Sequence, residues 1–223
     1  MPYSKVHIRQ PFNIAQNSRY LDIAAPHSGA KEKLMEALKD TYLPPPGVLT
    51  PNLAASLRQL SLHDASLSLE QIRQFHRSLR LSAQDLAPFR HFDDERYRRN
   101  RIYRDERCEL LLLCWRNGQR SQIHNHKGSL CGVRVIEGVA TETVFETTLA
   151  GQLAARETRE LAAGSLVING HLDIHQVANL QDGGEDLVTL HLYSPPLSRM
   201  ELFGMEPRQS RVPLLEDCLE YQI

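Results

Sequence analysis

Three histidines have the spacing needed to bind one metal ion. His124 and His126 flank Asn125 in a β-type run, and His175 lies in a later run, IHQVAN. Because alternate residues of a strand project from the same face, the first two imidazoles can reach one point, and the third could complete the set. Three neutral imidazoles leave a divalent metal with its full charge and about three open positions, a relative of the two-His, one-carboxylate ferrous oxygenase site. Two alternatives are a zinc site, which imidazole suits equally well, and an ordinary surface pair of histidines.

A second polar group lies on the run DLVTLHLY. If this run is a strand, Thr189, His191 and Tyr193 share one face, while the opposite face carries the apolar residues Val188, Leu190 and Leu192. A barrel interior that carries out chemistry needs such a polar face. The alternative is a half-exposed edge strand that presents its polar residues to solvent.

The elements that must position these residues are predicted to be strands. From about Cys108 the chain consists of short β-type runs separated by Gly, Asn and Asp. No helical pattern lies between them, which favours an antiparallel barrel or sandwich. The expected strands are CELLLLCW, SQIHNH, LCGVRVIE, VATETVFE, SLVIN, IHQVAN and DLVTLHLY.

The N-terminal part is predicted to be mainly helical. Residues 28–41 show a helical stripe, followed by a stiff turn at Pro44-Pro45-Pro46. A second helix is expected to begin at the capping box Ser68-x-x-Gln71 and to bury four side chains, those of Leu69, Ile72, Phe75 and Leu79. Residues 90–107 contain seven arginines and five acids and are predicted to be a solvated connection. We therefore expect a helical segment over 1–85, a barrel over 86–205 and an unassigned tail over 206–223.

Composition excludes several classes of protein. Twenty-six basic and 27 acidic residues give a net charge of −1, which does not favour nucleic-acid binding. No apolar run approaches the roughly 20 residues that cross a membrane, and the N-terminus has no secretory signal pattern. The four cysteines form no CxxC pair, so a disulfide scaffold is not expected. These features predict a cytoplasmic protein. The oligomeric state stays open, and a monomer is compatible with the sequence.

The histidines stand in a wider pattern that resembles the two paired motifs of the cupin superfamily. The pattern consists of Gly118, His124, His126, Cys131 and Gly138, and then Gly164, His175 and Asn179. The resemblance implies a small jelly-roll barrel with a metal bound inside it. The second motif departs from the usual one, because Gly170 and Leu172 stand where a proline and a glycine are common. Common cupins also carry a ligand glutamate where this chain has Cys131, so no carboxylate takes that position.

Residues 85–205 resemble, more specifically, the cysteine dioxygenase family of thiol dioxygenases. The resemblance rests on the missing glutamate, on the LLCW strand and on the segment HLYSPP from His191. It implies that His124, His126 and His175 bind Fe(II). Tyr97-x-Arg99-Asn100 resembles the family element whose arginine pairs with the substrate carboxylate.

The same resemblance assigns roles to a further group of side chains. Cys131 and Tyr193 fall on the pair that is joined by a thioether bond in the animal enzymes, and His191 on the histidine that orients the tyrosine hydroxyl. Thr189 replaces the usual serine and keeps a hydroxyl near the site. The alternative for Cys131 is a buried thiol that only packs.

The expected function is therefore oxidation of free L-cysteine by O₂ to cysteine sulfinic acid, with Fe(II) as cofactor. One alternative is the same chemistry on 3-mercaptopropionate, although relatives with that preference tend to carry glutamine where Arg99 stands. Another is a cupin that binds a metal or ligand without turnover. A zinc or manganese isomerase is disfavoured by the missing carboxylate ligand.

Overall fold

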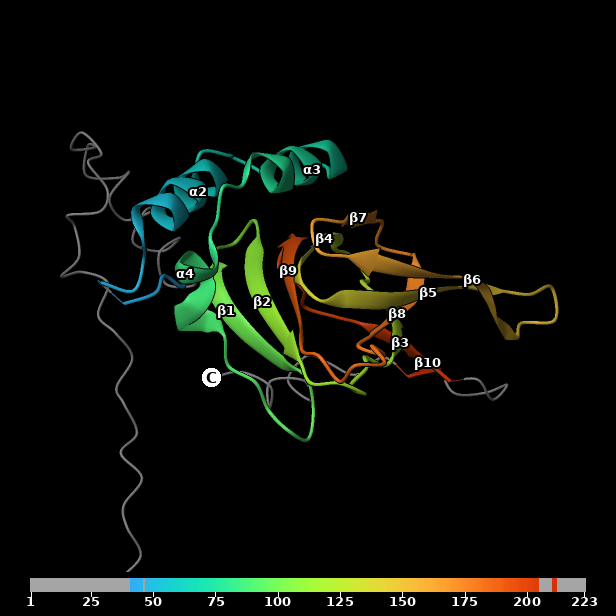
Figure 1. Ribbon diagram of the computed structural model, residues 1–223. Coiled ribbons are helices and arrows are strands. Elements are labelled where there is room, and N and C mark those ends of the chain that lie inside the picture. Colours follow the sequence, from blue (N-terminus) through green and yellow to red (C-terminus); the bar gives the residue numbers. More distant parts are fainter. Residues whose placement is uncertain (1–40, 46, 205–209, 212–223) are drawn as a thin grey trace, which may run out of the picture. The chain divides into compact units, whose positions relative to one another are not determined.

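The computed structural model describes residues 41–45, 47–204 and 210–211 (Figure 1). The helix expected over 28–41 lies outside the described residues, except for its last residue. The tail expected over 206–223 also lies outside them, except for residues 210 and 211.

Helices come first along the described chain. They are α2 (Pro51–Ser61), α3 (Leu69–Ser78), α4 (Ala83–Leu86) and the 3-10 helix η3 (Ala87–Phe89). The predicted capping box at the start of α3 is confirmed: Ser68 Oγ accepts from Gln71 N at 3.3 Å, and Gln71 Oε1 accepts from Ser68 N at 2.8 Å.

The packed stripe of α3 begins one turn later than predicted. Ile72 and Phe75 are buried, as is Leu79 just after the helix, but Leu69 is 38% exposed. The buried positions, with His76 among them, follow the spacing i, i+3, i+4 and i+7. Leu69 precedes this stripe at the first residue of the helix, so the prediction that it is buried is wrong.

The rest of the described chain is mainly β, in two antiparallel sheets (Figure 1). One sheet has the strand order β1-β2-β9-β4-β7, and the other has the order β11-β10-β3-β8-β5-β6. The strands are β1 (Arg98–Arg104), β2 (Glu109–Trp115), β3 (Ile123–Asn125), β4 (Leu130–Glu137), β5 (Val139–Thr147), β6 (Leu153–Ala162), β7 (Leu166–Asn169), β8 (Ile174–Ala178), β9 (Leu187–Ser194), β10 (Glu201–Phe203) and β11 (Ser210–Arg211). All seven predicted runs contain a strand.

The charged segment 90–107 is not simply a solvated connection. Its second half forms β1, which pairs with β2 and buries Asn100, Ile102 and Tyr103. Asp105, just beyond the strand, is also buried, and its carboxylate accepts from Tyr103 Oη at 2.8 Å. The prediction was wrong because the segment contains so many charged residues that the few buried positions between the arginines did not form a recognisable apolar pattern.

Strand β9 separates two apolar cores. Val188, Leu190 and Leu192 pack with the residues of the helices, whereas Tyr193 packs in the other core, between the sheets. Each fully buried leucine on such a face contributes about 1.5–3 kcal/mol. The predicted division of β9 into two faces is confirmed. The edge-strand alternative is wrong, because β9 lies between β2 and β4 and is buried throughout.

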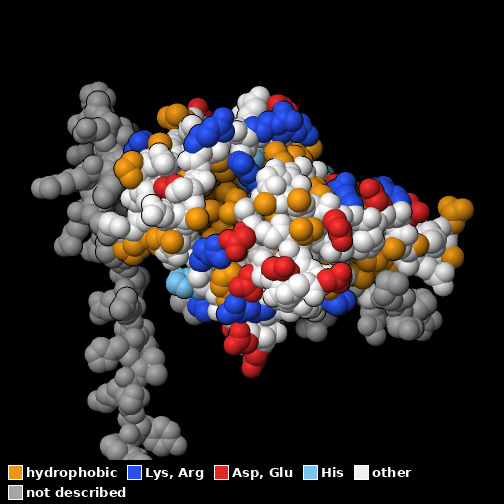
Figure 2. All heavy atoms as spheres, viewed as in Figure 1, with side chains coloured by type: hydrophobic (Ala, Val, Ile, Leu, Met, Phe, Trp, Pro, Cys, Tyr) orange, Lys and Arg blue, Asp and Glu red, His pale blue; other side chains and the backbone are white. Residues whose placement is uncertain are grey.

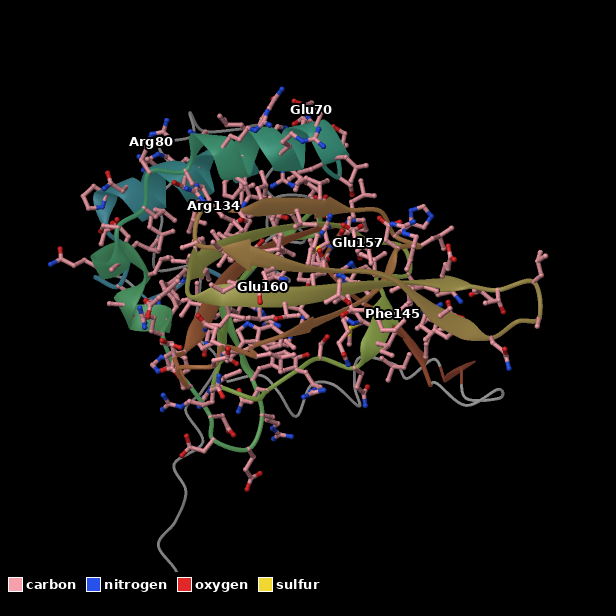
Figure 3. The ribbon with its side chains drawn as sticks, turned by 45° about the vertical axis from the view of Figure 1, so that its right-hand side comes forward. Glu70, Arg80, Arg134, Phe145, Glu157 and Glu160 are labelled. Atoms are coloured by element: carbon pink, nitrogen blue, oxygen red, sulfur yellow. The ribbon has the colours of Figure 1, made fainter. Side chains whose placement is uncertain are left out.

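Helix α3 approaches β4 closely because Gly132 has no side chain. A Cβ atom there would lie 2.5 Å from Ile72 Cγ2 and 2.8 Å from His76 Cδ2. His76 Nε2 lies 3.1 Å from the Gly132 carbonyl, and Arg134 Nη1 donates to the His76 carbonyl at 2.8 Å. Figure 3 labels Arg134 between the sheet and the helices. These contacts hold the strand that carries Cys131.

Within the described part of the chain, no helix is long and apolar enough to cross a membrane. On the face shown in Figure 2, basic and acidic side chains both occur, as expected from a net charge of −1.

Candidate metal centre

The three predicted histidines meet at one point between neighbouring strands. His124 lies on β3 directly opposite His175 on β8, and His126 follows β3 by one residue. Their candidate ligand atoms all lie within 4.8 Å of one another, and all three side chains are buried. The strand alternation that predicted convergence of the pair therefore also brings in the third histidine from the adjacent strand.

Hydrogen bonds at Nδ1 leave the Nε2 atoms of His124 and His175 free to bind a cation. His124 Nδ1 donates to the Gln122 carbonyl at 2.8 Å, and His175 Nδ1 donates to Glu142 Oε1 at 2.9 Å. His126 Nε2 and His175 Nε2 lie 3.4 Å apart. Donors about 2.0–2.1 Å from one metal ion lie roughly 3.0–3.4 Å apart, so this spacing fits shared coordination. The donor set suits a divalent transition metal.

Two of the three imidazoles, those of His124 and His126, are held in the neutral form that metals bind. Burial, followed by the neighbouring His175, lowers the pKa of His124 to about 3. Burial and the other two histidines also place the pKa of His126 well below its ordinary value. Lone pairs are therefore available at neutral pH.

Glu142 was not predicted from the sequence, yet it contacts the site directly. It lies on β5, is 2% exposed, and accepts from His175 through one carboxylate oxygen. Its other oxygen, Oε2, accepts from Arg159 Nε at 3.0 Å and from Arg159 Nη2 at 2.7 Å. Burial tends to raise the pKa of Glu142, but these two partners outweigh it, and the pKa lies below its ordinary value. A signal was present, since Glu142 shares a strand face with the apolar residues Ala140 and Val144 in VATETVFE.

A chain of hydrogen bonds leads to the phenol of Tyr193. Trp115 Nε1 donates to Thr189 Oγ1 at 2.9 Å, and this hydroxyl lies 2.9 Å from His191 Nε2. His191 Nδ1 in turn lies 3.1 Å from Tyr193 Oη. Thr189 thus reaches Tyr193 through His191, and the sequence interpretation missed Trp115 as the start of the chain.

Burial keeps both ends of this last hydrogen bond neutral. It places the pKa of His191 well below, and that of Tyr193 well above, its ordinary value. The Tyr193 ring lies 5.2 Å from the His126 ring, centroid to centroid. A neutral phenol is therefore placed beside one of the three candidate metal ligands.

Among the arginines of β1, Arg99 faces this site. Its guanidinium carbon lies 5.7 Å from the centroid of the Tyr193 ring. Arg101 lies on the same face but pairs with the buried Glu109 at 3.0 Å. Arg98 lies opposite Cys114 in the register of β1 and β2, and Cys114 belongs to the face that packs against the helices. Among the described residues, Arg99 forms no ion pair with a carboxylate.

Two further predicted residues lie next to these groups. Tyr97 stacks on Trp115, with ring centroids 4.1 Å apart and an interplanar angle of 19°. Cys131 is fully buried on β4, directly opposite Tyr193 on β9. Burial raises the pKa of the Cys131 thiol. Directly opposed residues of antiparallel strands have Cβ atoms about 4.5–5.5 Å apart, so the two side chains are neighbours.

His175 also lines an open pocket of about 400 Å³. Asn169, Arg156 and Arg159 contribute to its lining, but Tyr193 and Arg99 do not. The pocket therefore borders the candidate metal centre at His175 but does not reach Arg99 or Tyr193.

Comparison with known proteins agrees with this geometry. The family model described as cysteine dioxygenase type I matches residues 47–206. Cysteine dioxygenase type 1 of Danio rerio is 33% identical over 159 residues, which cover 68% of this chain and 77% of that protein. The human protein of the same name is 29% identical over 156 residues, with the same coverage of both chains. The chain belongs to the cysteine dioxygenase type I family and is therefore an oxidoreductase of the dioxygenase class.

Proposed function

We propose that this enzyme oxidises free L-cysteine with O₂ to cysteine sulfinic acid. The observation that carries the proposal is the convergence of three buried imidazoles beside Tyr193 and Arg99. A small thiol that carries a carboxylate needs a metal ion to bind its sulfur and a cationic group to bind its carboxylate. The three histidines could hold the metal ion, and Arg99 supplies the cationic group. The substrate and O₂ are the partners that the proposal requires.

The cofactor that we propose is Fe(II), held by His124, His126 and His175. When bound, it would take the substrate as a thiolate and supply the redox chemistry that activates O₂. Three neutral ligands suit this role because they leave the metal charge available to anionic substrate groups.

Arg99 would bind the substrate carboxylate. Burial tends to lower its pKa, but the phenols of Tyr193 and Tyr97 raise the pKa above its ordinary value, so the guanidinium stays charged. A planar guanidinium forms two parallel charge-assisted hydrogen bonds with a carboxylate, which fixes orientation as well as charge.

Tyr193 would donate a hydrogen bond to the substrate. If Thr189 donates to His191 Nε2, the other ring nitrogen carries the proton and donates to Tyr193 Oη. The phenol proton then points away from His191 and is free for a group in the site. In this arrangement Trp115, Thr189 and His191 act by orienting the phenol.

Cys131 and Tyr193 would become joined by a thioether bond during turnover. A bond forms between Sγ and the ring carbon beside the hydroxyl, the S–H and C–H hydrogens are lost, and O₂ accepts the two electrons. The support is their direct opposition across β4 and β9. Intact mass spectrometry after incubation with cysteine, iron and air should show a species lighter by two hydrogens. This species should be absent in Cys131→Ala, and an unshifted mass after many turnovers would contradict the bond.

Oxygen uptake tests the proposed substrate. Iron-reconstituted enzyme should consume O₂ faster with L-cysteine than with 3-mercaptopropionate, since the relatives that prefer 3-mercaptopropionate tend to carry glutamine where this chain has Arg99. Preference for 3-mercaptopropionate would assign the site to that thiol acid, and no uptake with either would favour a binding protein. The proposal also places the enzyme in a reducing, cytoplasmic compartment, consistent with the free buried thiols of Cys108, Cys114 and Cys131.

A further inference from the structure

The carboxylate of Glu142 lies between one metal-binding histidine and an arginine. Oε1 faces His175 Nδ1 at 2.9 Å, and Oε2 accepts two hydrogen bonds from Arg159. Strand pairing fixes both contacts, because Glu142 lies opposite Arg159 on β6 and next to β8. The position of the Glu142 carboxylate is therefore fixed by the pairing of β5 with β6 and with β8, and it does not depend on a loop.

The proton in this contact must lie on His175 Nδ1. An ionised carboxylate only accepts hydrogen bonds, so an unprotonated Nδ1 at 2.9 Å would repel it. The amide of Asn169 also lies 3.3 Å from the same nitrogen, but it is the more distant neighbour. With the proton on Nδ1, the Nε2 atom of His175 presents its lone pair toward His126.

Glu142 also differs from the partners of the other two histidines. His124 donates to a neutral backbone carbonyl, and His126 Nδ1 has no hydrogen-bond partner within the described part of the chain. Among the described residues, Glu142 therefore supplies the one carboxylate that is hydrogen-bonded to the histidine set. It places negative charge beside a site whose three ligands are neutral.

We infer that Glu142 is a positioning residue that fixes His175 in the tautomer able to bind metal through Nε2 and increases its strength as a donor. Arg159 holds the carboxylate in place from its far side. Carboxylates in this outer position commonly change metal affinity by about 10- to 100-fold. The inference rests on the proposed metal site but not on the identity of the substrate.

Metal affinity tests the inference without reference to turnover. Co²⁺ binding is measured by competition with a chelator in the wild type, Glu142→Gln and Glu142→Ala. The control is Glu160→Gln, which changes an exposed acid on β6 that Figure 3 labels. We expect affinity to fall about 10-fold in Glu142→Gln and about 100-fold in Glu142→Ala, with the control unchanged. Thermal unfolding of each metal-free variant separates loss of affinity from loss of fold.

The tautomer itself gives a second readout. Long-range proton–nitrogen NMR spectra of Zn²⁺-loaded, ¹⁵N-histidine-labelled protein should show His175 protonated at Nδ1. A folded Glu142→Gln variant that binds Co²⁺ as tightly as Glu160→Gln would overturn the inference, as would a wild-type His175 without a proton on Nδ1. Failure of the wild type to bind Co²⁺ would instead contradict the proposed metal site.

Discussion

Replacing Arg99 by Gln should selectively weaken the use of substrates that carry a carboxylate. Arg99 lies over the Tyr193 ring, on the side of β1 that faces the histidines. Because it pairs with no carboxylate among the described residues, its charge is available to a ligand. Arg101, by contrast, is engaged by Glu109.

The size of the effect follows from the bonds that are lost. Hydrogen bonds to a charged group contribute about 1.5–3 kcal/mol, which corresponds to about a 10- to 150-fold fall in kcat/KM. Glutamine keeps a donor but loses the charge and the parallel pair of N–H groups. We expect the loss for L-cysteine and little change for cysteamine, which lacks a carboxylate.

Steady-state O₂ uptake with both thiols measures this selectivity. Arg98→Gln is the matched control, because it removes the same charge one residue away on the opposite face of β1. Unchanged kcat/KM for cysteine in Arg99→Gln, or an equal loss in Arg98→Gln, would refute the assignment of Arg99.

Two further predictions concern the histidines. His175→Ala should lose metal and activity, because two imidazoles retain a divalent ion poorly; full metal content with a near-normal rate would exclude His175 as a ligand. Burial lowers the pKa of His76 to about 4, so between about pH 6.5 and 4 the unfolded chain binds a proton that the native state does not. The free energy of unfolding should therefore decrease as the pH is lowered. Relative to His76→Gln, the decrease between pH 7.5 and pH 5 should be about 2 kcal/mol, as measured by denaturant unfolding. Parallel pH profiles for the two proteins would contradict this.

Sequence patterns predicted the strands that carry apolar runs or apolar alternation, such as β2 and β9, and missed strands rich in charged residues. Strand β6 contains the polar run of residues 156–160, lies at the edge of its sheet and has no buried residue, so no apolar pattern reveals it. Strand β1 was missed because it carries arginines on both of its faces. These arginines find their ion-pair and ring partners only in the folded chain. One such contact pairs Arg101 with Glu109, and another places Arg99 over Tyr193.

The candidate site shows the same division. The histidine spacing was readable because strand geometry places residues i and i+2 on one face. The contacts of Glu142 could not be predicted in that way, since they depend on the pairing of β5 with both β6 and β8. Contacts across three strands depend on register, which no local pattern specifies.

The most direct test of the proposed function is the fate of the oxygen atoms. Iron-loaded enzyme is incubated with L-cysteine under ¹⁸O-labelled O₂, and the product is analysed by mass spectrometry. We predict cysteine sulfinic acid in which both of the added oxygen atoms carry the heavy isotope. A sulfinate with one heavy atom, formation of disulfide alone, or the same yield from His175→Ala would contradict dioxygenation at this site.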